Sequence, residues 1–287
     1  MKILFTLLSI LPKSFYKFCI RIFMTLGLHK FSSSYRVTKI NIKIARPLLN
    51  NTQITQAANS SYAQSLISIY ETFYALSRNP IRINNNILVV KNNYLIHEYI
   101  EKQNGLVVVA IHNRSVDMLL SWINSQTNTV SLYKKIKLKI LDTYVRKIRE
   151  NNVNKTFETS VLGVKKILKA LKNNEVIAIA SDQVPARGHG EYVDFFGKKS
   201  YTTTLVPRLA CKTKKPVVFC CLNSLSNSNL LAINIESSDK NLYDNSKCLL
   251  SMNQSIEKLI NTNISDYSWE YKRFRRPITG ETDPYIN

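Results

Sequence analysis

The sequence lacks a long apolar segment, a cysteine pattern and a cluster of histidines, and each absence excludes a class of protein. No uncharged apolar run approaches the roughly 18–20 residues that a membrane-spanning helix needs, which excludes a polytopic membrane protein. The five cysteines form no CxxC pair and no dense framework, which indicates reduced thiols in a cytosolic setting. The four histidines are too scattered to form a ligand set, so we expect no bound metal.

Acidic residues are scarce relative to basic ones. The chain of 287 residues has 19 Asp and Glu against 40 Lys and Arg, a formal net charge of +21 at pH 7. Such an excess points to an anionic partner, such as nucleic acid, a lipid surface or an acidic carrier protein. The remaining composition, 45% hydrophobic and 21% charged, is that of a globular protein and excludes a disordered or collagen-like chain.

Residues 1–31 form an N-terminal segment that combines apolar and basic residues. Lys13, Lys17 and Arg21 recur every four residues and so share one face of a helix, whereas Phe15 lies on another side. The pattern is typical of an amphipathic helix in a membrane interface, and we predict a membrane-associating segment over 1–31. Two alternatives stay open: a signal peptide, although no small-residue cleavage site follows the apolar run, and a core helix with solvated lysines.

The rest of the chain, 32–287, has the pattern of one α/β domain. Apolar residues at three- and four-residue steps indicate helices within 35–80. Short apolar runs typical of strands buried on both faces follow at 87–90, 105–111, 176–180 and 216–222. Helical stretches at 117–123 and 163–171 alternate with them, so we predict a central, mostly parallel sheet flanked by helices. The Asn- and Ser-rich segment 223–229 is predicted to be a surface loop.

The motif IHNRSVD holds the first candidate catalytic pair. His112 directly follows the apolar run 105–111, so we expect it at the carboxyl end of a buried strand, where open α/β sheets bind their ligands. Asp117 is expected in the first turn of the next helix, from which its carboxylate can fold back to the imidazole. A carboxylate on one ring nitrogen leaves the other nitrogen free to accept a proton. The alternative is a structural pair without catalytic function.

A second candidate segment is rich in turn-forming residues and also follows an apolar run. It contains Asp182, Gln183 and Arg187, and an aromatic stretch at 192–197 and three threonines at 202–204 come next. As a functional element it is a second wall of the same site, with Arg187 and backbone amides facing an anionic group. As a structural element it is a long turn, a hydrophobic plug and a helix cap, and the residues alone leave both interpretations open.

Taken together, these motifs resemble those of the bacterial lipid A biosynthesis acyltransferases, the late lauroyl/myristoyl transferases of the glycerolipid acyltransferase superfamily. The shared features are an H-x4-D/E motif, a D-Q block before a Gly-rich turn, a V-x-F-F-G segment, a Thr-rich segment with an Arg-Leu-Ala helix, and a closing aromatic-basic block. In this sequence they stand, in that order, at His112 and Asp117, at Asp182 and Gln183, at 193–197, at 202–210 and at 267–277.

The resemblance implies a glycerolipid-acyltransferase-like fold and transfer of a fatty acyl group from an acyl carrier protein thioester to a hydroxyl of a lipid A precursor, with no cofactor. His112 would be the general base, oriented by Asp117, and Arg149 would donate to the oxyanion, with Arg146 as the alternative match. The residues implied in substrate binding are Asp182, Gln183, Arg187, Thr203 and Arg273. No Ser or Cys lies in a nucleophile-elbow context, so the acyl group would pass directly to the acceptor.

The resemblance also implies partners and a location. The partners are acyl carrier protein and anionic membrane lipid, and the location is the cytoplasmic face of a bacterial inner membrane; we expect a monomer. The basic residues at 272–276 would bind lipid A phosphates, and a solvated basic tail is the alternative. A nucleic-acid-binding protein is a further alternative, but the basic residues are dispersed and no nucleic-acid-binding motif is present.

The sequence departs from the family pattern after the histidine and in the family's second block, and the usual Gly shortly after the matched arginine is also missing. Arg114 and Ser115 replace the Gly and Asn that usually follow the histidine, and Leu138 and Lys139 stand where an Asn-Pro pair is usual. These departures leave two alternatives open. One is the same chemistry on another acceptor, such as a glycerolipid or an ornithine lipid, and the other is a catalytically weak relative.

Overall fold

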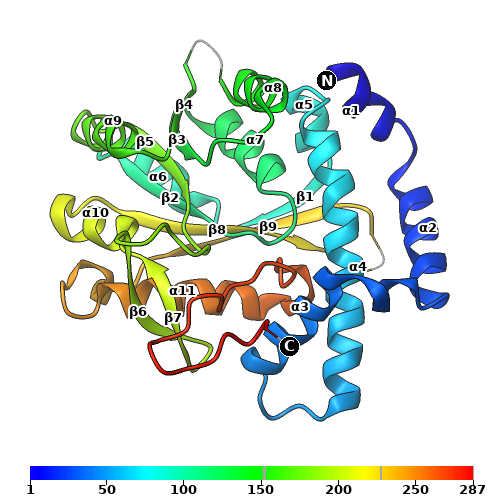
Figure 1. Ribbon diagram of the computed structural model, residues 1–287. Helices are drawn as coiled ribbons and strands as arrows, with labels where there is room; N and C mark the ends of the chain where they lie inside the picture. The colour runs from blue at the N-terminus through cyan, green and yellow to red at the C-terminus, as the bar shows by residue number, and fades with distance from the viewer. Residues whose placement is uncertain (151–152, 227, 287) are drawn as a thin grey trace.

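The computed structural model describes residues 1–150, 153–226 and 228–286 of the chain. Within these residues a seven-stranded sheet lies at the centre, with helices on both of its faces (Figure 1). The strand order is β1-β9-β8-β2-β5-β3-β4, and every neighbouring pair is parallel except β8 and β9. The predicted α/β class with a mostly parallel sheet flanked by helices is therefore confirmed.

The strands are short and are separated in the sequence by helices. The strands of the sheet are β1 Ile87–Lys91, β2 Leu106–Ala110, β3 Thr129–Tyr133, β4 Lys155–Glu158, β5 Val176–Ala180, β8 Val217–Ser224 and β9 Leu231–Ser237. A separate antiparallel hairpin consists of β6 Gly190–Phe195 and β7 Lys198–Thr203. The α-helices are α1 Lys2–Leu8, α2 Lys13–Thr25, α3 Ser33–Ala45, α4 Asn51–Ala75, α5 Pro80–Asn84, α6 Tyr94–Glu101, α7 Val116–Gln126, α8 Lys139–Arg149, α9 Val161–Lys172, α10 Leu205–Thr213 and α11 Cys248–Thr262. Short 3-10 helices cover Leu28–Phe31, Lys240–Tyr243 and Ile264–Asp266.

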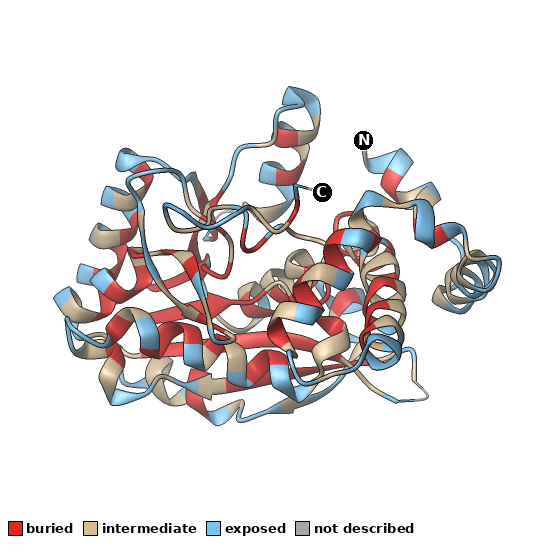
Figure 2. Ribbon diagram, turned by 60° about the horizontal axis from the view of Figure 1, so that its bottom comes forward, coloured by how far each residue is buried: buried red, intermediate tan, exposed pale blue. Residues whose placement is uncertain are grey.

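Alternate residues of the central strands pack against two helical layers. In β2, Val107 and Val109 belong to a core with α9, α10 and α11, whereas Leu106 and Val108 belong to a core with α6 and α7. Figure 2 shows the strands of the sheet buried, with exposed residues on the outer sides of the helices. Because both faces are covered, every residue of β2 is apolar, which is why this strand appears in the sequence as a continuous apolar run.

Neighbouring strands β2 and β5 end level with each other, and this positions the candidate site. Ala110, the last residue of β2, lies opposite Ala180, the last residue of β5. His112 and Asp182 therefore each lie two residues beyond the end of adjacent parallel strands. This is the edge at which open α/β sheets bind ligands.

The predicted strands and helices coincide with β1, β2, β5, β8, α7 and α9, whereas β3, β4, β9 and the hairpin were not predicted. The hairpin occupies the segment interpreted above as a hydrophobic plug. Its turn consists of Phe196 and Gly197, which both have positive φ (+51° and +74°), as a two-residue hairpin turn requires. The predicted loop 223–229 begins later than expected, because β8 continues to Ser224; residue 227 of that loop lies outside the described residues.

The basic face of α2 is turned toward the protein. The ammonium group of Lys13 donates to the carbonyl of Asn229 at 2.8 Å, and that of Lys17 donates to the carbonyl of Ser228 at 2.9 Å. None of the residues of α2 is fully buried. The alternative of a core helix with solvated lysines is therefore wrong, since the lysines face inward.

The apolar side of the N-terminal segment is turned outward. Phe15 and Phe18 of α2 are 47% and 58% exposed, and α1 adds further exposed apolar side chains. No single helix in the described part of the chain is long and apolar enough to cross a membrane. Together, α1 and α2 have the length and the apolar composition of a membrane-spanning segment, but the angle between the two helices is 69°.

Candidate active site

His112 and Asp182 form the centre of the candidate site. The backbone amide of His112 donates to Asp182 Oδ2 at 3.0 Å, and the imidazole Nδ1 lies 2.6 Å from Asp182 Oδ1. The Asp182 side chain is fully buried, whereas 27% of the His112 side chain is exposed. Because an ionised carboxylate only accepts hydrogen bonds, Nδ1 carries the proton of a neutral His112 ring and Nε2 is the proton acceptor.

Burial and the carboxylate charge act in opposite directions on His112. Burial alone lowers the pKa of His112, but the charge and hydrogen bond of Asp182 outweigh burial, so the pKa of His112 is raised above its ordinary value. Burial raises the pKa of Asp182, but the influence of His112 prevails there too, so the pKa of Asp182 is lowered. Asp182 therefore stays ionised and keeps the imidazole basic.

The predicted pairing of Asp117 with His112 is wrong. Asp117 lies in the first turn of α7, as predicted, but its Oδ1 accepts from Arg149, at 2.8 Å from Nε and 2.6 Å from Nη2. Arg149 is the last residue of α8, so the ion pair joins the end of α8 to the start of α7. Asp182 occupies the position beside the imidazole that the sequence motif suggested for Asp117.

The turn that carries His112 is held by the C-terminal segment. The backbone amide of Ser268 donates to the carbonyl of His112 at 2.9 Å, and the amide of Arg114 donates to the carbonyl of Asp266 at 2.9 Å. These two bonds fix the backbone of the turn on both sides of Asn113. The position of His112 thus depends on residues more than 150 positions later in the chain, since Asp266 is 152 residues from Arg114.

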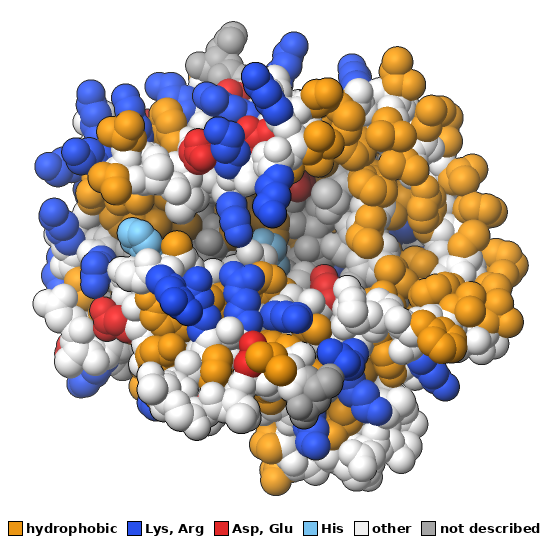
Figure 3. Space-filling view, viewed as in Figure 1, with side chains coloured by type: hydrophobic (Ala, Val, Ile, Leu, Met, Phe, Trp, Pro, Cys, Tyr) orange, Lys and Arg blue, Asp and Glu red, His pale blue; other side chains and the backbone are white. Residues whose placement is uncertain are grey.

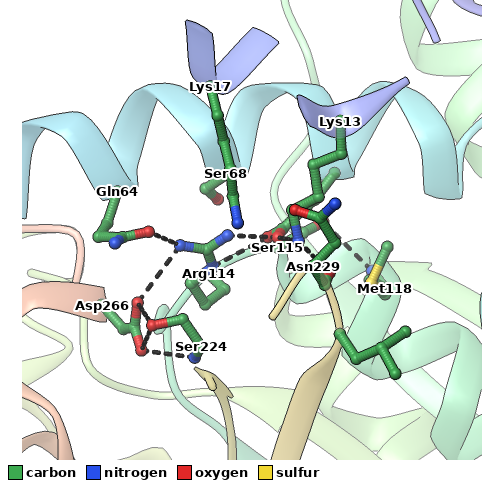
Figure 4. Close-up of polar contacts among 12 residues, drawn as sticks. Lys13, Lys17, Gln64, Ser68, Arg114, Ser115, Met118, Ser224, Asn229 and Asp266 are labelled. Atoms are coloured by element: carbon green, nitrogen blue, oxygen red, sulfur yellow. Dashed lines mark hydrogen bonds and ion pairs between the residues drawn. The ribbon is translucent and has the colours of Figure 1, made fainter. Parts of the chain in front are cut away.

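Arg114 combines a strained backbone with a buried ion-pair network (Figure 4). Its φ of +57° is a conformation that Gly adopts readily and other residues rarely adopt. Its guanidinium is buried and contacts Glu71, with Nε 3.0 Å from Oε2, and Asp266 at 3.3 Å, and Nη1 donates to Gln64. Lys13 of α2 reaches the same Glu71 at 2.7 Å. Burial raises the pKa of Glu71, but the charges of Arg114 and Lys13 outweigh burial and lower it.

Ser115 caps the N-terminus of α7. Its Oγ accepts from the backbone amide of Met118 at 3.2 Å. Thr72 Oγ1 of α4 donates to the same oxygen at 2.9 Å. Asn and Ser are comparable helix N-caps, so this departure leaves the start of α7 intact.

A cavity of about 340 Å³ lies beside His112 at the carboxyl edge of the sheet. Arg149, Gln183 and Thr203 line it with His112, and aliphatic walls are supplied by Val116, Leu120, Leu132, Ile179, Val184 and Leu205. Arg149 also borders a smaller cavity of about 120 Å³, which Asp117 lines as well. Figure 3 shows Lys and Arg side chains gathered around a hollow in the middle of this face.

The structure separates the residues that the resemblance assigned to substrate binding. Gln183 and Thr203 line the cavity, and Asp182 lies buried behind His112. Arg187 is exposed and is not among the residues that line the cavity. Arg273 is buried, with its guanidinium donating to the carbonyl of Tyr201 at 3.0 Å and to Thr202 Oγ1 at 2.7 Å, so it anchors the hairpin instead of facing the cavity.

The closing aromatic-basic block packs against the second segment of the site. Arg276 donates to the carbonyl of Pro185 at 2.8 Å, and the hydroxyl of Tyr271 accepts from the amide of Val184 at 2.9 Å. The alternative of a solvated basic tail is therefore wrong for Arg273 and Arg276. Tyr271 lines the cavity and was not among the predicted site residues. Its signal in the sequence is its place among the aromatic residues of the aromatic-basic block.

Comparison with known proteins adds one finding. A family model described as bacterial lipid A biosynthesis acyltransferase matches residues 1–276. No curated protein matches the chain. The matched region contains the N-terminal segment and every candidate site residue described above.

Proposed function

Since the chain belongs to the bacterial lipid A biosynthesis acyltransferase family, which implies an acyltransferase, we propose that it moves a fatty acyl group from an acyl carrier protein thioester to a hydroxyl of a lipid A precursor. The observation that carries this proposal is the His112–Asp182 pair beside a cavity with aliphatic walls. It provides a base and a place for an acyl chain side by side. A cofactor has no part in the proposed reaction.

His112 is the proposed general base. Its Nε2 takes the proton of the acceptor hydroxyl as that oxygen attacks the thioester carbonyl, a new C–O bond forms and the C–S bond breaks. The proton then passes from His112 to the departing thiolate of the carrier. Asp182 holds the Nδ1 proton and stabilises the imidazolium that forms in between. General-base help of this kind contributes typically ~10²–10⁴ in rate.

Arg149 is the proposed donor to the oxyanion. It lines the His112 cavity, and its ion pair with Asp117 holds the guanidinium in one orientation. A donor fixed in this way contributes roughly 3–4 kcal/mol to the stability of the transition state. Asp117 is thus a positioning residue for Arg149 in this proposal, and Asp182 is the positioning residue for His112.

The aliphatic walls of the cavity suit the acyl chain. Val116 and Leu120 come from α7, Leu132 from β3 and Leu205 from α10. The acyl chain would therefore lie between helices and the carboxyl edge of the sheet. Gln183 and Thr203 also line the cavity and would bind polar parts of the substrates. Two buried thiols, Cys220 and Cys221, have a pKa raised by burial and do not line this cavity, which supports direct transfer.

The protein is proposed to act on the cytoplasmic face of the bacterial inner membrane as a monomer. The exposed apolar side of 1–31 would lie in the lipid, and 32–287 would carry the catalytic site. The net charge of +21 would attract both acyl carrier protein, which is acidic, and anionic lipid.

Mass spectrometry of the reaction products tests the proposal. Membranes containing the protein are incubated with acyl carrier protein thioesters and a tetra-acylated lipid A precursor, and we expect the precursor to gain one acyl chain. His112→Ala should abolish the gain, whereas His189→Ala, at an exposed histidine outside the cavity, should not. A second arm offers a glycerolipid and an ornithine lipid, because the departures at Arg114, Ser115, Leu138 and Lys139 favour another acceptor as the second candidate. Absence of transfer in both arms would contradict the proposal.

A further inference from the structure

A separate, polar cavity of about 490 Å³ lies beneath α2. Its walls come from the inner face of α2, from α4, from residues 225–226 and 228–230 between β8 and β9, and from the segment that precedes Tyr267. It shares no lining residue with the cavity beside His112. We call it the α2 pocket and define it by Lys17, Arg21, Gln64, Arg114 and Asn229, which all line it.

The α2 pocket holds more positive than negative charge. Lys13, Lys17, Arg21 and Arg114 line it. Two of these cations are compensated by buried carboxylates, since Lys13 lies 2.7 Å from Glu71 and Arg114 lies 3.3 Å from Asp266. Across the described residues, Lys17 and Arg21 have no ion pair with a carboxylate, and Lys17 donates only to the carbonyl of Ser228. Two cations in the pocket therefore lack an anion.

The excess positive charge of the pocket affects the pKa of Lys17. Figure 4 shows the Lys17 side chain extending from α2 to the guanidinium of Arg114. Burial lowers the pKa of Lys17, and the positive charges of Lys13 and Arg114 lower it further. An anion placed among these groups removes the repulsion and accepts hydrogen bonds from them.

We propose that the α2 pocket binds a phosphate-bearing group through Lys17 and Arg21. The tetrahedral, multiply charged phosphate matches the forked guanidinium of Arg21 and the ammonium of Lys17, and the amides and hydroxyls of the remaining wall supply further donors. The same helix exposes Phe18 and Ile22 on its outer side, so the phosphate of a membrane lipid is one source and free phosphate is the other. The pocket is separate from the His112 cavity, so this inference stands or falls independently of the acyl-transfer proposal.

The test uses the full chain purified in a nonionic detergent. Inorganic phosphate is titrated by equilibrium dialysis, and flotation compares vesicles of phosphatidylglycerol with vesicles of phosphatidylcholine. The pocket variant is Lys17→Gln/Arg21→Gln. The matched control is Lys165→Gln/Lys169→Gln, which removes the same charge at the same spacing from exposed positions of α9. Thermal unfolding verifies that both variants fold; the pocket variant should not be less stable, because it removes mutually repelling charges.

We expect the pocket variant to bind phosphate about tenfold more weakly, or to lose about tenfold of its preference for phosphatidylglycerol, while the control matches wild type. If the pocket variant loses affinity for inorganic phosphate alone, the site is assigned to free phosphate. If it loses the preference for phosphatidylglycerol vesicles, the ligand is a lipid headgroup. If neither arm responds to the pocket variant more than to the control, the proposal is overturned. It is overturned as well if wild type binds no phosphate and shows no preference for phosphatidylglycerol over phosphatidylcholine.

Discussion

Asp182 accepts two hydrogen bonds from His112, one from the backbone amide at 3.0 Å and one from the imidazole at 2.6 Å. One carboxylate therefore fixes both the backbone position and the ring orientation of the candidate base. The two residues follow Ala110 and Ala180, which are partners in register on β2 and β5. Strand pairing thus brings the two residues together, and the bond from the Ser268 amide to the His112 carbonyl helps to hold the turn that carries the imidazole.

Asp182→Asn should lower kcat by about a hundredfold or more, because Asn cannot stabilise the imidazolium that forms during proton transfer. Asp117→Asn should have a smaller effect, about tenfold, because it loosens only the ion pair that holds Arg149. Steady-state rates of acyl transfer measure both. The reverse order, with Asp117→Asn the more harmful, would show that Asp117 orients the base in the working enzyme.

The pH profile of kcat provides a separate test of the pair. Transfer needs neutral His112, so kcat should rise with pH and level off above the pKa of His112, which lies above its ordinary value of 6.5. In Asp182→Asn burial is opposed only by the smaller effects of Glu270 and Asp117, so the pKa of His112 should fall and the midpoint should move to lower pH. In Asp117→Asn the midpoint should stay close to that of wild type. An unchanged midpoint in Asp182→Asn would contradict the assignment of His112 as the titrating base.

The sequence predicted those parts of the fold in which one physical signal dominates. Strands β2, β5 and β8 are buried on both faces and therefore appear as unbroken apolar runs. Strand β4 was missed because it has four residues at the edge of the sheet and only Thr156 is buried. Strand β3 was missed because it begins with Thr129 and because Ser131 interrupts its apolar residues.

The partner of His112 could not be predicted from the sequence, because the two residues are far apart along the chain. Asp117 is five residues from His112, so a local pair was the natural prediction, whereas Asp182 is 70 residues away. Which carboxylate meets the imidazole depends on β2 and β5 being neighbours, and strand order is not visible in the motifs. The inward direction of Lys13 likewise depends on a buried carboxylate, Glu71, on another helix.

Arg114→Ala should reduce the free energy of unfolding by about 3–5 kcal/mol, because it leaves the buried Glu71 and Asp266 carboxylates without their main cation. Arg114→Gly should be less harmful by about 1 kcal/mol, since Gly adopts the φ of +57° without strain. Urea unfolding followed by circular dichroism measures both variants. Equal losses in the two variants would show that the backbone at this position carries no strain.

The exposed apolar side of α2 leads to a prediction about membranes that is independent of charge. Phe15→Ser/Phe18→Ser should weaken binding to vesicles of neutral phosphatidylcholine about thirtyfold or more, because each of the two phenyl rings that enter the lipid contributes on the order of 1 kcal/mol or more. Flotation with neutral lipid removes the contribution of the basic residues, so a loss reports on apolar contact alone. Val161→Ser/Leu162→Ser is the matched control, because these side chains on α9 are 69% and 71% exposed and lie outside the N-terminal segment. If the control weakens binding as much as the α2 variant does, the membrane contact cannot be assigned to residues 1–31, and the catalytic domain itself would have to provide it.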